Sequence, residues 1–98
     1  MTVSIDLPRL IGTRDAARRL LAELNVPDVL RSERVCIDAR DLSTATTSFT
    51  DELLEQLSQR EALEIVVVRA PVEFREQVAA SVRVHEWTNV RFDSLVDH

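Results

Sequence analysis

The stretch VCIDARDLSTATTSFTDELLEQL, residues 35–57, joins an apolar segment, a hydroxyl-rich loop and an amphipathic segment. Residues 35–37 are apolar and Asp38 follows them, which is typical of a strand inside a sheet that ends in a turn. Six of the eight side chains at 43–50 carry a hydroxyl group. Apolar residues then recur at 49, 53 and 57, the spacing of one helix face. The stretch therefore predicts a strand over Arg34–Asp38, a polar loop, and a helix from about Ser48 to Gln59.

The residues before this stretch predict another strand and helix. Thr2 to Leu7 alternates polar and apolar side chains, as a half-buried strand does. After a turn at Gly12, Thr13 has the character of a helix N-cap, and the helix should run to about Leu24. Its buried stripe is predicted at positions 16, 20 and 24.

The residues after it repeat the alternation of strand and helix. The β-branched run Ile65–Val68 favours a strand covered on both faces of a parallel sheet. Pro71 suits the first turn of a third helix, with Phe74, Val78 and Val82 facing the core. Residues 89–95 predict a short fourth strand. The pattern indicates a single α/β domain over residues 1–98, with a small, mostly parallel sheet of about four strands and three helices.

Composition narrows the classes of function. The chain has 98 residues, a net charge of −5 and scattered arginines, which disfavours nucleic acid as a partner. A single cysteine, Cys36, excludes an intramolecular disulfide and fits a reducing compartment. We find no signal peptide and no long apolar run, so we expect a cytoplasmic protein that does not enter a membrane.

The residue pattern does not favour catalysis, a cofactor or a metal. Gly12 is the only glycine, which excludes phosphate-cradling glycine loops and the glycine-flanked serine of hydrolases. His85 and His98 have no cysteine or acidic partners in a zinc-binding pattern. An enzymatic interpretation with Ser48 as nucleophile lacks an evident base. We therefore predict a protein that is not an enzyme.

Functional residues should gather where parallel strands end. Asp38, the loop to Ser48, and Arg69 after the third strand come to this same edge. Two roles are open for Ser48. It could cap the helix by accepting a bond from a backbone N–H near Asp51, or it could accept a phosphate at the positive end of the helix dipole. For Asp38 and Asp41, side-chain bonds to the backbone of a turn are favoured over metal binding.

The motif Ser48-Phe49-Thr50-Asp51-Glu52-Leu53, with the upstream segment Ile11-Gly12-Thr13-Arg14, resembles a known family. It is similar to the STAS-like family of unknown function, whose hallmark reads roughly Ser-Phe-x-Asp-Glu-Leu. More distantly, strand, acid, loop and helix resemble STAS domains (sulphate transporter and anti-sigma factor antagonist). The resemblance spans nearly the whole chain, and its specific part covers about sixteen residues.

The resemblance implies a regulatory protein-interaction domain. In anti-sigma factor antagonists, an ATP-binding anti-sigma kinase phosphorylates a serine at the start of this helix, ten residues after the acid that closes the strand. Asp38 and Ser48 keep that spacing, so Ser48 is the matching candidate phosphoacceptor. The implied partner is a GHKL-type ATP-binding kinase or an anti-sigma factor. It would dock on the loop and on the second helix's face, which we predict to be exposed; the partner-binding candidates are Asp38, Asp41, Ser43, Thr46, Thr47, Thr50, Glu52 and Gln56.

An alternative is a constitutive structural or assembly module that never takes phosphate. It could act as a homodimer or as a subunit of a larger complex. Thr46 and Phe49 favour this alternative, because anti-sigma factor antagonists usually carry an acid and a glycine at these positions.

Overall fold

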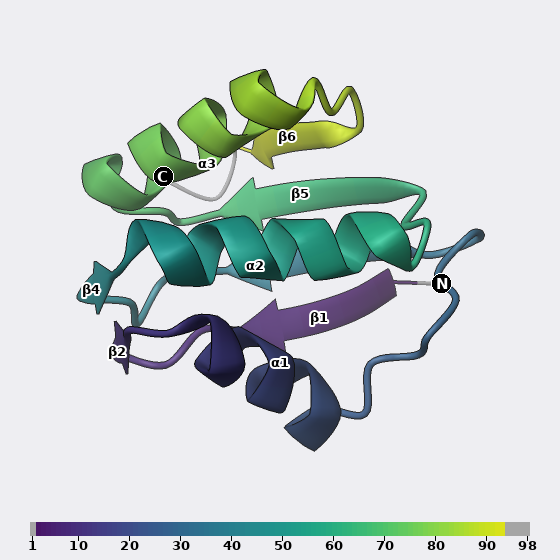
Figure 1. Cartoon of the computed structure of the whole chain (residues 1–98), viewed down its shortest axis with the longest axis horizontal. Helices are drawn as coiled ribbons and strands as arrows, with labels where there is room; N and C mark the ends of the chain where they lie inside the picture. Colours follow the sequence, from purple (N-terminus) through teal and green to yellow (C-terminus); the bar gives the residue numbers. More distant parts are fainter. Residues whose placement is uncertain (1, 94–98) are drawn as a thin grey trace.

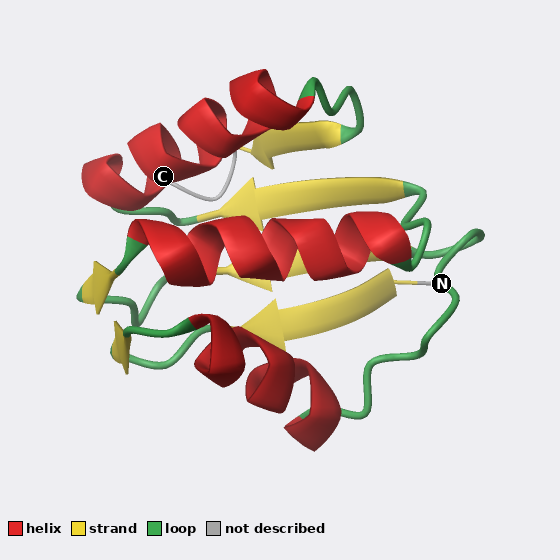
Figure 2. Ribbon diagram, in the orientation of Figure 1, coloured by secondary structure: helices red, strands yellow, loops and turns green. Residues whose placement is uncertain are grey.

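The computed structural model describes residues 2–93, which form a four-stranded sheet, a separate two-stranded ladder and three helices (Figures 1 and 2). The strands are β1 (Thr2–Asp6), β2 (Leu10–Ile11), β3 (Arg34–Asp38), β4 (Thr44–Ala45), β5 (Glu64–Val68) and β6 (Val90–Asp93). The helices are α1 (Arg14–Glu23), α2 (Thr47–Gln59) and α3 (Val72–His85).

All strands of the main sheet are parallel, in the order β1-β3-β5-β6. Each helix connects one strand to the next, and each step moves in the same direction across the sheet. Because such crossovers are right-handed, the three helices must lie on the same face. Accordingly, α2 packs between α1 and α3, and Figure 1 shows all three in one layer in front of the sheet. The predicted fold class is confirmed.

The core lies between this helix layer and the sheet. The predicted stripe of α2 is confirmed, since Phe49, Leu53 and Leu57 are fully buried. Val35 and Ile37 of β3 face them and are fully buried as well. Within residues 2–93, no helix has both the length and the apolar character needed to cross a bilayer.

The buried stripe of α1 differs from the prediction. Ala17 and Leu21 are the fully buried residues, while Leu24 is 43% exposed. Leu24 is the C-cap residue, with non-helical backbone angles, so it no longer follows the helical spacing. The predicted cap at the other end is confirmed, because the Thr13 hydroxyl accepts a hydrogen bond from the Ala16 N–H at 2.9 Å.

The two strands predicted to be central, β3 and β5, are central. Side chains alternate along a strand, so Cys36 points away from the helices that cover Val35 and Ile37. It is only half-buried. Burial, and then the nearby carboxylate of Asp38, raises the pKa of the Cys36 thiol, which fits an unreactive cysteine. The fourth strand is β6, and the part of that prediction beyond residue 93 lies outside the described residues.

The ladder of β2 and β4 was not predicted. It pairs Leu10 with Thr44 and Ile11 with Ala45, just beyond the carboxyl ends of β1 and β3 (Figure 1). Two-residue strands are too short for alternation to show in a sequence. The ladder leads directly into α1 and α2, so it sets where both helices begin.

Candidate functional site

Thr46, and not Ser48, caps α2. The Thr46 backbone is extended, and its hydroxyl accepts a hydrogen bond from the Phe49 N–H at 3.2 Å. The same hydroxyl donates to the carbonyl oxygen of Gly12 at 3.0 Å. The helix begins earlier than predicted because the Thr46 N–H donates to the Ile11 carbonyl at 3.2 Å, which holds the chain extended up to residue 46. The predicted capping role of Ser48 is therefore wrong.

Ser48 is the second residue of α2 and is exposed. Among the hydrogen bonds of residues 2–93, none involves the Ser48 hydroxyl. The first residues of a helix carry backbone N–H groups without helical partners, and these favour an anion at this end. Ser48 is thus exposed at the end of α2 that favours an anion, with the acids Asp51 and Glu52 close behind it in the chain.

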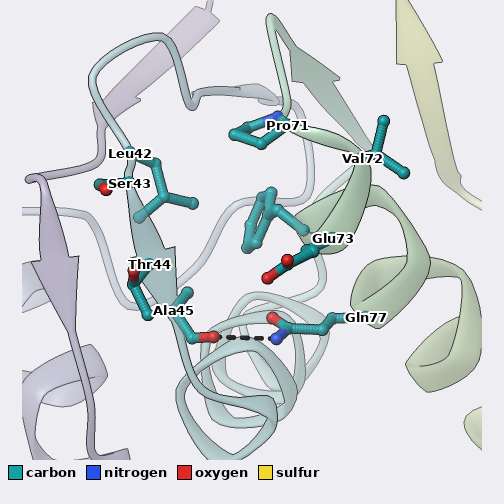
Figure 3. A pocket seen from close by; sticks show the side chains of 9 residues that line it. Leu42, Ser43, Thr44, Ala45, Pro71, Val72, Glu73 and Gln77 are labelled. Carbon is teal, nitrogen blue, oxygen red and sulfur yellow. Dashed lines mark hydrogen bonds between the residues drawn. The ribbon is translucent and has the colours of Figure 1, made fainter.

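A cleft of about 340 Å³ lies between the hydroxyl-rich segment and the start of α3 (Figure 3). Gln77 joins its two walls, because its Nε2 donates to the Ala45 carbonyl at 2.8 Å. Its Oε1 accepts a hydrogen bond from Thr50 Oγ1 at 2.7 Å. Figure 3 shows the Glu73 side chain directed across the cleft toward the opposite wall. The lining residues are Leu42, Ser43, Thr44, Ala45, Pro71, Val72, Glu73, Phe74 and Gln77.

The loop to Ser48 and the segment after β5 were predicted to meet at the carboxyl ends of the strands. This prediction is only partly confirmed. Residues 42–45 do face residues 71–77 across the cleft. Arg69, which has a left-handed backbone with φ of 54° and an exposed side chain, forms no hydrogen bond or ion pair with Ser48 within residues 2–93.

The predicted turn-forming role is confirmed for Asp38 but not for Asp41, whose side chain forms no bond to the backbone within residues 2–93. Asp38 accepts a hydrogen bond from the Arg40 N–H at 2.9 Å, so its turn-forming role is confirmed. Asp41 is exposed and forms a long ion pair with Arg40, at 3.8 Å. Thr47, the first helical residue, is exposed.

Thr50 and Glu52 are not on an exposed face of α2, contrary to the prediction. Thr50 is fully buried and Glu52 is 6% exposed. Because α1 and α3 flank α2 on both sides, most of the polar side of α2 faces another helix. Gln56 is half-buried and donates to Glu52 Oε2 at 2.8 Å. These residues contribute to helix packing, and the accessible part of the predicted docking surface is the loop and the first residues of α2.

Two arginines of α1 neutralise the buried Glu52. Arg14 Nη1 lies 3.2 Å from Glu52 Oε1, and Arg18 Nη1 lies 3.3 Å from Glu52 Oε2. Arg14 Nη1 also lies 3.4 Å from Asp51 Oδ2. The two separated motif segments, 11–14 and 48–53, thus meet through Arg14. A buried carboxylate needs such partners, so this part of the motif has a structural role.

Asp51 is bonded to α3 as well as to α1. Its Oδ1 accepts a hydrogen bond from Ser81 Oγ at 2.7 Å and lies 3.0 Å from His85 Nε2. Partial burial by itself would raise the pKa of Asp51. The bonds from Ser81 and His85, with the charges of His85 and Arg14, outweigh burial and hold that pKa below its usual value.

The lowered pKa of Asp51 predicts acid sensitivity. A carboxyl whose pKa is lower in the folded state stabilises the fold above its ordinary pKa of about 3.9, and this contribution is lost as the pH falls through the folded value. We expect Asp51→Asn to lower the free energy of unfolding at pH 7 by about 1 kcal/mol. The expected loss is small because Asp51 and its partners border solvent, which screens their charges. Urea unfolding of the wild type and of Asp51→Asn, repeated from pH 7 down to about pH 3, measures the difference between their free energies of unfolding. A difference that stays constant over this range would contradict the lowered pKa of Asp51.

A second prediction separates the cap from the exposed serine. Thr46→Ala removes both the N-cap bond and the bond to Gly12, so it should cost about 1–2 kcal/mol. Ser48→Ala removes no hydrogen bond and should change stability by less than about 0.5 kcal/mol. Urea denaturation midpoints of the two variants test this, and equal losses would show that the cap is assigned to the wrong residue.

Sequence reasoning missed the α3 residues that hold the site together, Gln77, Ser81 and His85. Their partners lie 27 to 34 residues away in the chain, in β4 and α2. Such pairs leave no local pattern, since helical spacing reports only which side of one helix is buried.

No protein-family model, no curated protein and no solved structure matches this chain. The similarity to the STAS-like family therefore rests on the motif residues alone and stays a hypothesis.

Proposed function

We propose that this domain is a regulatory docking module that binds a protein partner through a hydroxyl edge, defined as Ser43, Thr44, Thr47 and Ser48. All four side chains are exposed. The observation that carries the proposal is the position of Ser48 at the start of α2, where it is exposed and forms no hydrogen bond within residues 2–93. Ser43 and Thr44, at the other end of the same edge, line the cleft. Together with the cleft walls, this surface can contribute to the roughly 800 Å² that one partner buries in a standard interface.

The hydroxyl edge is fixed in place by bonds behind it. Thr46 ties the segment to Gly12, and Gln77 ties it to α3. The Ser43 and Thr44 N–H groups both donate to the Arg9 carbonyl, at 2.8 and 3.0 Å. A surface that is already ordered loses less conformational entropy when it binds, which favours a docking role.

Phosphorylation of Ser48 is the switch that we propose for this surface. Asp51 and Glu52 follow Ser48 closely and would repel a phosphate by their charge. Arg14 is paired with both carboxylates and offsets much of that repulsion. A phosphate would add nearly two negative charges to the hydroxyl edge, which a partner would otherwise contact through neutral hydroxyl groups. In keeping with the family resemblance, the proposed partner is a GHKL-type ATP-binding kinase or an anti-sigma factor.

The test is to incubate the protein with a GHKL-type kinase and ATP and to map any modification by mass spectrometry. We expect one phosphate, on Ser48, and none on Ser48→Ala. Ser32→Ala is the matched control, because Ser32 is exposed just before β3, at the opposite edge of the sheet, and its loss should change nothing. Ser48→Asp should alter the Kd for the partner at least about tenfold. Phosphate on another residue, or no phosphate, would refute the switch.

The constitutive module remains the second candidate, and the fixed position of the hydroxyl edge favours it, since a preformed surface needs no modification to bind. In that case Ser48→Ala and Ser48→Asp should bind the partner equally. Gln77→Ala, which frees one cleft wall, should weaken binding in both cases.

A further inference from the structure

We propose that Asp51, Glu55 and His85 form a site for one divalent transition-metal ion of the zinc type, on the surface between α2 and α3. One potential ligand atom from each of these side chains lies within 4.8 Å of the other two. Asp51 and Glu55 stand one helical turn apart on α2, and His85 is the last residue of α3. The site uses no residue of the hydroxyl edge and does not depend on the proposed function.

The distances suit a small ion with little rearrangement. His85 Nε2 and Asp51 Oδ1 are 3.0 Å apart. Two ligands of a tetrahedral zinc ion, each bonded at about 2.0–2.1 Å, lie about 3.3 Å apart. The ion would therefore replace the direct contact between imidazole and carboxylate. Glu55 is half-buried, and a carboxylate oxygen of it lies within 4.8 Å of the other two ligand atoms, so its side chain would have to rotate to complete the site.

Neighbouring groups already orient two of the ligands. The His85 ring is stacked on Trp87, with ring centroids 4.4 Å apart and an interplanar angle of 11°. Ser81 Oγ donates to Asp51 Oδ1, and Arg14 Nη1 lies near Asp51 Oδ2. Such outer partners hold ligands in position and are usual around metal sites. The positive charge of Arg14 opposes a cation, so the site should bind the metal reversibly.

The donor set selects the class of metal. One imidazole and two carboxylates suit Zn²⁺ and its neighbours Co²⁺ and Ni²⁺, whereas Mg²⁺ and Ca²⁺ prefer oxygen ligands alone. The two carboxylates balance the charge of a divalent ion. Three protein ligands leave a fourth position for water. In the sequence His85 has no partner, and only the packing of α3 on α2 brings it to the two acids.

Trp87 provides the test, because it is the only tryptophan in the chain and contacts the ligand His85. The purified, untagged full chain is titrated with Co²⁺, a paramagnetic quencher, and the fluorescence of Trp87 is followed. We expect saturable quenching with one ion per chain, reversed by Zn²⁺ but not by Mg²⁺. Zn²⁺ should also raise the Tm, because a ligand that binds only the folded state stabilises it.

Variants assign the site. Glu55→Gln and His85→Gln should each weaken Co²⁺ binding at least about tenfold, the smallest effect expected when even an outer partner of a metal site is lost. Three control variants should bind Co²⁺ with the affinity of the wild type. They remove an exposed acid (Glu73→Gln), the thiol (Cys36→Ser) and the other histidine (His98→Gln). Both ligand residues border solvent, so the variants should fold, which circular dichroism verifies. Equal affinity in Glu55→Gln, loss of binding in a control, or no saturable quenching would overturn the proposal.

Discussion

Phe49→Ala should lower the free energy of unfolding by about 3–5 kcal/mol, the usual cost of deleting a buried phenylalanine side chain. The Phe49 side chain is fully buried between the helix layer and the sheet. Small domains are stable by only about 5–15 kcal/mol, so this one change removes a large part of the total. Urea denaturation followed by circular dichroism measures the effect.

Phe49→Leu is the matched control, because it keeps an apolar side chain and most of the volume. It should cost clearly less than Phe49→Ala. If Phe49→Ala instead cost less than about 1.5 kcal/mol, this residue of the motif would not be part of the core.

The double variant Arg14→Met, Arg18→Met should lose about 3 kcal/mol. It leaves the Glu52 carboxylate, 6% exposed, without either of its cations. Removing the partners of a buried charge costs about 3–5 kcal/mol, and the half-exposed arginines place this pair at the low end. Methionine keeps the apolar stem, so packing is largely preserved. Thermal and urea unfolding both measure the loss.

Adding Glu52→Gln to that double variant is the decisive control. A neutral amide costs much less to bury than a carboxylate, so the triple variant should recover most of the lost stability. A triple variant less stable than the double one would mean that Glu52 contributes through packing or through Gln56, and not through its charge.

The fold could be predicted because each element has a local signal. The β-branched run at 65–68 and the apolar residues at 49, 53 and 57 specify a buried strand and a one-sided helix, and both were placed correctly. The handedness of crossovers then leaves one arrangement for parallel strands in chain order. Thr13 could be identified as a cap because its capping bond, from the Ala16 N–H, lies within its own helix start and needs no partner from another part of the chain.

The site was harder to predict, because it depends on pairs distant in the chain. Thr46 rather than Ser48 caps α2, since the unpredicted ladder with β2 keeps residue 46 extended. Thr50 and Glu52 read as exposed on an isolated helix, but helices on both sides cover them. For Asp51 and His85, which are 34 residues apart, no pattern in the sequence indicates contact.

The ladder of β2 and β4 has a consequence for local opening. Each of its strands has two residues, and it lies outside the main sheet. So short a pairing can break while the four-stranded sheet and the helix layer stay folded, because few buried contacts are lost. Amide protons there should exchange with solvent well before those of β3 and β5. Such opening would release Thr44 of the hydroxyl edge only briefly, while Thr47 and Ser48 stay on α2, where they are already exposed.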